Sequence, residues 1–135
     1  MKPYLHTIGV VVQDMPATLA FHRALGLDIP AGEDLSPHVE YVANSGYAIG
    51  FVAEAMVRQR DPRWQDSFGH RLNLQFRLNS PAEVDATHAK LVALGHTSYK
   101  APWDAFLGQR FARVIDPNQN VVNLFSPLPG GIEPA

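Results

Sequence analysis

One pattern occurs twice along the chain, and this repetition limits the possible folds more than any other feature of the sequence. Each copy begins with a segment typical of a β-strand, Leu5 to Val12 in the first and Arg71 to Leu78 in the second. A turn containing proline then leads into a helical segment that ends in Leu-Gly, at Gly26 and at Gly95. Shorter strand-like segments follow each helix. The repetition predicts an α+β protein made of two tandem β-α-β-β-β modules.

Local signals indicate where these elements begin and end. Asp14 can cap the first helix, and Pro16 suits its first turn. Ser80-Pro81-Ala82-Glu83 has the form of a capping box for the second helix. The first strand of the second copy alternates strictly between polar and apolar residues, which predicts one buried face and one polar face. The remaining strands are expected at Val39–Ala43, Tyr47–Ala53, Thr97–Lys100, Arg110–Ile115 and Val121–Phe125.

The expected modules occupy residues 1–58 and 70–127. Between them, residues 59–69 are polar, contain Pro62 and show no clear periodicity. We interpret this segment as a linker or as a loop lying over a site. Residues 128–135 are rich in proline and glycine and form the expected flexible tail.

The composition excludes several classes of protein. The chain has 135 residues, of which 46% are hydrophobic and 18% charged, a balance typical of a globular protein. It contains no cysteine, so disulfides, thiolate nucleophiles and cysteine metal sites are excluded. The net charge of −2 gives no electrostatic reason to expect nucleic acid or a membrane as partner. Met1-Lys2-Pro3 leads directly into a strand-like segment, without the apolar stretch of a signal peptide, so we expect a soluble cytoplasmic protein.

Three stretches of the sequence resemble the vicinal oxygen chelate superfamily, which contains glyoxalases, bleomycin-resistance proteins and extradiol dioxygenases. They are Ile8–Leu27, Ser80–Gly95 and Ile115–Phe125. The third resembles the superfamily's Asp-Pro-Asp-Gly-Asn turn, with Asn118 in place of the second aspartate and Gln119 in place of the glycine. The stretch from Pro102 to Phe111 also resembles members that bind ligands without transforming them.

The resemblance implies a cup-shaped mixed sheet with the helices outside, paired in a homodimer, and in many members a divalent ion inside the cup. Aligning the chain on Asp14 and on Ser80-Pro81 places the metal-ligand positions at Thr7, Asn73 and Asn123, with a further one near Gly50. Threonine and asparagine offer only neutral oxygens and glycine has no side chain, whereas a catalytic divalent ion needs imidazole or carboxylate donors. We therefore expect no metal and no other cofactor.

A shifted alignment keeps a metal possible. If the first strand slipped by one residue, His6 would face the cup, but the slip would also turn every other side chain of the strand to the opposite face. His70 would need a shift of three residues. Among the remaining histidines, only His38 is a candidate for contact with a ligand, because it comes directly before a cup strand.

A cup without metal can still bind a small molecule, and neutral polar side chains with aromatic walls suit a flat, moderately polar ligand. Arg110 could add a donor for a carbonyl, carboxylate or phenolate, although it can equally pair with Asp104 or Asp116. Any one of the aromatic residues is more often core than pocket, so the hypothesis depends on their joint placement. The candidate ligand-binding residues are Thr7, His38, Tyr41, Trp64, Asn73, Gln75, Trp103, Phe106, Arg110, Phe111 and Asn123.

The leading interpretation is a metal-free binding protein that sequesters an aromatic natural product or antibiotic and has no catalytic residues. The alternative is a metal-dependent lyase, isomerase or dioxygenase of the same superfamily. A third possibility is a small-molecule sensor or an interaction module. The first interpretation predicts an aromatic small molecule as the partner of a homodimer.

Overall fold

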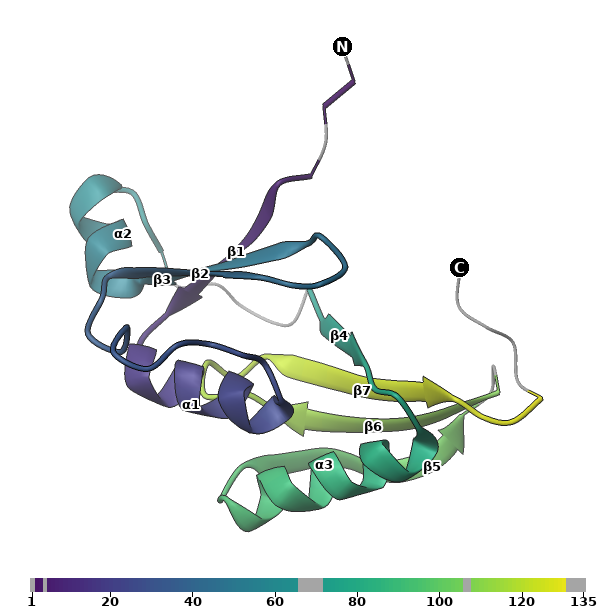
Figure 1. Ribbon diagram of the computed structural model, residues 1–135. Helices are drawn as coiled ribbons and strands as arrows, with labels where there is room; N and C mark the ends of the chain where they lie inside the picture. The colour runs from purple at the N-terminus through teal and green to yellow at the C-terminus, as the bar shows by residue number, and fades with distance from the viewer. Residues whose placement is uncertain (1, 4, 66–71, 106–107, 131–135) are drawn as a thin grey trace. The chain divides into compact units, whose positions relative to one another are not determined.

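The computed structural model describes residues 2–3, 5–65, 72–105 and 108–130, and within these ranges it confirms the α+β class. This part of the chain contains three helices and seven strands, and the strands form two open, mixed sheets (Figure 1). The chain divides into two compact units, unit 1 with Met1–Arg23 and Leu27–Ser67, and unit 2 with Ala24–Gly26 and Phe68–Ala135. None of the helices in the described ranges is long and apolar enough to cross a membrane.

Unit 1 contains a three-stranded sheet in the order β1-β3-β2. Strand β1 runs parallel to β3, whereas β2 and β3 form an antiparallel hairpin. The elements are β1 (Thr7–Val12), α1 (Met15–Leu25), β2 (His38–Val42), β3 (Ala48–Ala53) and α2 (Glu54–Arg60).

The core of unit 1 lies between α1 and one face of this sheet. It is formed by Val12, Met15, Leu19, Ile29, Val39 and Phe51. Because side chains alternate along a strand, the neighbours of Phe51 on β3 lie on the opposite face of the sheet. This opposite face includes Gly50, where an added Cβ would lie 3.1 Å from Thr7 Cγ2 and 3.5 Å from His38 Nε2.

Unit 1 lacks one of the three strands expected after its helix. Residues 27–37 remain irregular, because two prolines and a glycine interrupt the segment, and proline cannot donate to a strand ladder. Arg23 of α1 holds the segment instead, donating to the Ile29 carbonyl oxygen at 3.0 Å and the Pro30 carbonyl oxygen at 2.8 Å. The same guanidinium pairs with Asp34 Oδ1 at 2.9 Å. Side-chain hydrogen bonds from α1 therefore fix the irregular segment in place.

Helix α2 was not anticipated from the sequence. It begins directly after β3, contains the ion pair between Glu54 and Arg58 at 3.2 Å, and has no buried residue. A helix without a buried face leaves no periodic apolar pattern, which explains why the sequence did not reveal it.

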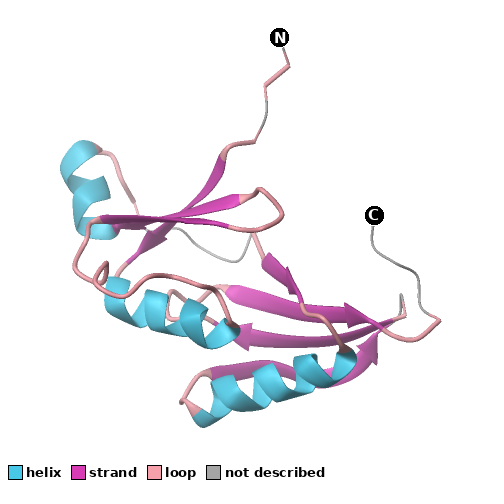
Figure 2. Cartoon of the chain, in the orientation of Figure 1, coloured by secondary structure: helices cyan, strands magenta, loops and turns pink. Residues whose placement is uncertain are grey.

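Unit 2 is a full β-α-β-β-β module with strand order β4-β7-β6-β5. The elements are β4 (Leu74–Arg77), α3 (Pro81–Ala93), β5 (Thr97–Ala105), β6 (Gln109–Ile115) and β7 (Val121–Pro127). Strands β4 and β7 are parallel, and the other neighbours are antiparallel. Helix α3 covers one face of the sheet (Figure 2), and the residues buried there are Val84, Leu91, Ala112, Val114, Val122 and Leu124.

The capping box starts α3 as expected. Ser80 Oγ accepts a hydrogen bond from the Glu83 backbone N–H at 3.2 Å. Glu83 Oε2 in turn accepts from the Asn79 N–H at 3.1 Å. Pro81 occupies the first helical position, where its missing N–H has no intrahelical partner to lose.

The turn between β6 and β7 is organised by one buried carboxylate. Asp116 Oδ1 accepts hydrogen bonds from the backbone N–H groups of Asn118 and Asn120, both at 2.8 Å. Gln119 has a φ of 67°, the left-handed conformation that favours glycine. This is the position at which the superfamily pattern has glycine and this chain does not.

The substitution Gln119→Gly is expected to stabilise the protein by about 0.5–1 kcal/mol. It removes the left-handed strain of a side chain, which exceeds the extra flexibility glycine gives the unfolded chain. Urea unfolding measures the difference. Gln119→Ala is the control, because alanine keeps the strained Cβ and should give no gain; an equal gain from alanine would contradict the explanation.

Candidate functional site

Two neighbouring rows of side chains cross the face of the second sheet that lies opposite α3. Because Ala112, Val114, Val122 and Leu124 face α3, the residues between them face the other way. Strand pairing aligns Trp103 with Phe111 and Phe111 with Phe125, which we call the aromatic row. It likewise aligns Lys100 with Arg113, Arg113 with Asn123 and Asn123 with Gln75, which we call the polar row.

The aromatic row is a connected set of three half-buried rings. The ring centroids of Trp103 and Phe111 are 5.2 Å apart, with planes tilted by 56°. Those of Phe111 and Phe125 are 6.1 Å apart, with planes only 20° from parallel. Such pairs stabilise a sheet by about 0.5–1.5 kcal/mol beyond the area they bury. The rings therefore hold one another in place on three adjacent strands.

A β-bulge brings Lys100 and Trp103 to the same face. These residues are three positions apart on β5, a spacing that regular alternation would place on opposite faces. The register shifts between them, and the shift restores a common orientation. As a result, the Lys100 ammonium lies 3.9 Å from the centroid of the Trp103 ring.

The polar row contains a donor and an acceptor without partners. Among the described residues, Arg113 Nε is buried and makes no hydrogen bond, although its guanidinium carbon lies 5.7 Å from the Trp103 ring and 5.6 Å from the Phe111 ring. Asn123 is 3% exposed, and its Oδ1 also has no partner within this part of the chain. Buried polar atoms are normally satisfied, so each of these requires an explanation.

Arg110, a candidate ligand residue, lies on the face of the second sheet that α3 covers, opposite to the aromatic row. It precedes Phe111 directly, and strand alternation sends consecutive side chains to opposite faces. Its guanidinium donates to both carboxylate oxygens of Asp85 on α3, at 2.9 and 3.2 Å, and to Asp104 Oδ1 at 3.1 Å. Hydrogen bonds to Asp85, followed by those to Asp104, raise the pKa of Arg110 above its ordinary value. Arg110 thus links α3 to strands β5 and β6 through its hydrogen bonds to Asp85 and Asp104.

The candidate residues of unit 1 are divided between different places. The side chains of Thr7 and His38 both lie next to Gly50, on the face of the first sheet opposite α1. The Thr7 hydroxyl oxygen is buried and has no hydrogen-bond partner among the described residues. Tyr41 instead packs against the core cluster beneath α1, because it lies three positions after His38. Trp64 follows α2 and donates its backbone N–H to the Asp61 carbonyl oxygen at 3.0 Å.

Three candidates from the second half remain. Gln75 belongs to the polar row and is exposed, whereas Asn73 is exposed immediately before β4 begins. Phe106 lies outside the described residues. The sequence analysis missed Lys100, Arg113 and Phe125. Alternation from Phe111 would have found Arg113, because it lies two positions further along β6.

The residues at the metal-ligand positions do not fit a catalytic divalent ion. Thr7 supplies one neutral hydroxyl, Asn73 and Asn123 supply amides, and Gly50 supplies no side chain. Within the described ranges, no group of three or more histidine, cysteine, aspartate or glutamate side chains is placed to hold a metal ion.

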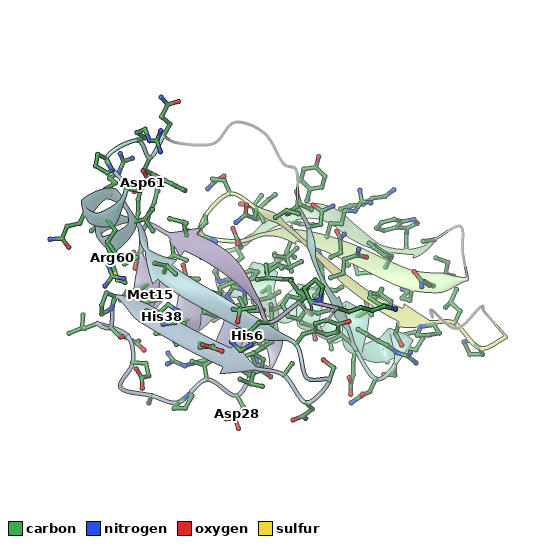
Figure 3. All side chains as sticks on the ribbon, turned by 90° about the horizontal axis from the view of Figure 1, so that it is seen from above. His6, Met15, Asp28, His38, Arg60 and Asp61 are labelled. Carbon is green, nitrogen blue, oxygen red and sulfur yellow. The ribbon has the colours of Figure 1, made fainter. Side chains whose placement is uncertain are left out.

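The shifted alignment of the first strand is not observed. Thr7 pairs with Ala48, and its side chain lies on the same face as Gly50, where an added Cβ would be 3.1 Å from Thr7 Cγ2. His6 precedes β1, has a side chain that is 76% exposed, and has its Nε2 3.8 Å from Glu40 Oε1. Figure 3 labels His6 and His38, which come from the segment before β1 and from the start of β2.

Comparison with protein families gives a match over almost the whole chain. The model of the Glyoxalase/Bleomycin resistance protein/Dioxygenase superfamily matches residues 4–124. The chain belongs to this superfamily. The match confirms the resemblance seen in the sequence, while the superfamily itself includes both enzymes and binding proteins. Comparison with curated protein sequences gives no significant match.

Solved structures of the superfamily share the fold at low sequence identity. An enzyme of the superfamily from Burkholderia phytofirmans has 23% identity and a TM-score of 0.77, over 92% of this chain and 98% of that one. A superfamily protein from Nocardioides has 20% identity and a TM-score of 0.72, over 100% and 90%. A lactoylglutathione lyase from Agrobacterium tumefaciens has 17% identity and a TM-score of 0.66, over 93% and 94%. These similarities establish the fold.

The substitution Arg110→Gln is expected to lower the melting temperature, because glutamine cannot bridge Asp85 and Asp104. The loss should shrink in about 1 M salt, where exposed ion pairs are largely screened. Thermal unfolding at low and high salt measures both effects. Arg63→Gln, a change of the same type at an exposed position of unit 1, is the control. A loss independent of salt would contradict the ion-pair role.

Proposed function

We propose that this protein binds a planar aromatic small molecule and sequesters it without transforming it. The observation that carries the proposal is the aromatic row, in which Trp103, Phe111 and Phe125 lie side by side on three paired strands. The ligand class is an aromatic natural product, such as an antibiotic. Protection would follow from lowering the free concentration of the compound in the cytoplasm.

The physical basis is stacking on a surface that is already in place. Each ring is fixed by its neighbours, so little side-chain freedom is lost when a ligand binds. Aromatic stacking adds about 0.5–1.5 kcal/mol per contact beyond the buried area. A ligand that contacts two or three rings would gain about 1–4.5 kcal/mol from stacking, in addition to the free energy of burying its apolar surface.

The proposal includes a homodimer, as the superfamily resemblance implies. A stable dimer should bury at least about 1,000 Å² of surface. The mass of the protein in solution, determined by sedimentation, tests this part independently of ligand binding. A sensor or an interaction module would be favoured if the protein bound no aromatic ligand at all.

The second candidate is a metal-dependent lyase, isomerase or dioxygenase. It is favoured by the structural similarity to proteins called an enzyme and a lactoylglutathione lyase. The neutral side chains of Thr7, Asn73 and Asn123 make a metal-dependent enzyme the weaker candidate, because they would bind a divalent ion weakly.

Elemental analysis after purification, followed by titration with Zn²⁺, Ni²⁺, Mn²⁺ and Fe²⁺, separates the two candidates. We expect substoichiometric metal and no tight binding of any of the four ions. Treatment with a chelator should leave ligand binding unchanged. One tightly bound ion per chain would instead make the enzyme the leading candidate.

The substitution Trp103→Ala is expected to weaken binding of an aromatic ligand at least about tenfold, the loss of roughly one stacking contact with its buried area. Ligands are first found by fluorescence quenching in Trp64→Phe, which leaves Trp103 as the only tryptophan of the two in the chain. Calorimetry then compares affinities for the ligand found.

Tyr99→Ala is the matched control, because Tyr99 is an aromatic residue of the same strand that is 57% exposed. It should leave affinity unchanged. Trp103→Ala should lower the melting temperature by a few degrees, because the ring pair with Phe111 is lost, so affinities are compared well below the unfolding transition. Equal affinities of the wild type and the Trp103 variant would remove this face from the binding site.

A further inference from the structure

We infer that the ligand of the aromatic row is an anion, whose negative group is held by Arg113 and Lys100 of the polar row. This inference rests on the proposed function, since both rows lie on one face of one sheet. It adds the charge of the ligand and the position of its charged group, neither of which the superfamily or the aromatic row specifies.

The cations of the polar row have no acidic partner among the described residues of unit 2. Asp85 and Asp104 both pair with Arg110 on the side of α3. Asp116 accepts hydrogen bonds within the turn before β7, and Glu83 accepts at the start of α3. The described acids of this unit are thus engaged elsewhere, and among the described side chains Arg113 and Lys100 give the face with the aromatic row a positive charge.

Arg113 is placed to receive a planar anion. Its guanidinium lies beside the rings of Trp103 and Phe111, and its Nε is buried without a hydrogen-bond partner in the described part of the chain. A guanidinium binds a carboxylate through two parallel hydrogen bonds, which requires a free edge that includes Nε or two terminal nitrogens. A carboxylate attached to a stacked ring would satisfy this donor once a neighbouring side chain moves to admit it, because Nε is buried in the structure.

Lys100 contributes from the edge strand of the sheet. Its ammonium lies over the Trp103 ring and is exposed to solvent, whereas Arg113 is half-buried one strand further in. An anion between the two would therefore have one buried and one exposed cation as neighbours. Attraction by the exposed cation is weakened by salt, because mobile ions screen it.

Asn123 specifies a second feature of the ligand. Its carbonyl oxygen Oδ1 is buried without a partner among the described residues, and its strand partner is Arg113. An unsatisfied acceptor beside a cation suits a ligand that carries an O–H or N–H group next to its anionic group. The chemical class is therefore an aromatic carboxylate with an adjacent hydroxyl or amino group.

The test compares three probes that share one ring system: 2-naphthamide, 2-naphthoate and 3-hydroxy-2-naphthoate. Binding is followed by the NMR signals of the two indole N–H groups, with Trp64 as an internal control. We expect 2-naphthoate to bind at least about tenfold more tightly than the neutral amide, as expected for a hydrogen bond to a charged group. The hydroxynaphthoate should bind more tightly still, and salt should weaken both anions but not the amide.

The variant Arg113→Gln should abolish the preference for the anion over the amide. Arg110→Gln is the matched control, because it removes the same charge from the same strand but on the opposite face of the sheet. Lys100→Gln, at an exposed position, provides a second test if the Arg113 variant does not fold; it should reduce the preference and its dependence on salt. Asn123→Ala would leave a buried cavity beside β6 and β7, so a loss of affinity in this variant would not isolate the lost hydrogen bond.

The outcomes distinguish this inference from the proposed function. If the amide and the naphthoate bind equally well and both shift the Trp103 signal, the ligand need not be an anion, and only the inference is overturned. If no probe shifts the Trp103 signal, both are overturned. If Trp103→Ala converts a dimer into a monomer and no probe binds, the face is covered by a second copy of the chain, which also overturns both.

Discussion

In each unit, the first strand pairs in parallel with the last, and the rest of the structure depends on this pairing. Parallel strands cannot be joined by a tight turn, so the chain must leave the sheet and return through a helix. In unit 2, β5 runs in the same direction as β4, so α3 is the crossover between them. In unit 1, α1 and residues 27–37 together carry the chain from β1 to β2, which runs in the opposite direction. The helix buries one face of its sheet, and strand alternation then commits every second side chain to the opposite face. The aromatic and polar rows share that opposite face of the second sheet for this reason.

The sequence predicted most of these elements, because the signals that define them are local. Asp14, Ser80 and the glycines after each helix act within a few residues of the helix ends they determine. The missing edge strand of unit 1 shows the limit of such reasoning. Pro30, Gly32 and Pro37 indicate that residues 27–37 are irregular, whereas the path of this segment depends on hydrogen bonds from Arg23 to residues six to eleven positions away, which no local pattern records.

Which side chains share a face of the second sheet was not predicted from the sequence, for two physical reasons. First, Arg110 and Phe111 were assigned to one face although consecutive residues of a strand point in opposite directions. Applying alternation strictly would have exchanged Arg110 for Arg113. Second, the common orientation of Lys100 and Trp103 depends on a β-bulge, which shifts the register without any signal in the sequence beyond a nearby proline. Family membership was visible because it depends on the elements, whereas function depends on which few side chains share a face.

The β-bulge in β5 has a further consequence for how the protein behaves at high concentration. Strand β5 is the outermost strand of its sheet, and an outermost strand has backbone donors and acceptors that can recruit another chain. The register shift and Pro102 interrupt that row of groups in the middle of the strand, and the lysine beside them adds charge. The irregularity that turns Lys100 towards Trp103 therefore also hinders the growth of the sheet by addition of further strands. One local distortion thus both aligns Lys100 with Trp103 and interrupts the exposed edge of the sheet.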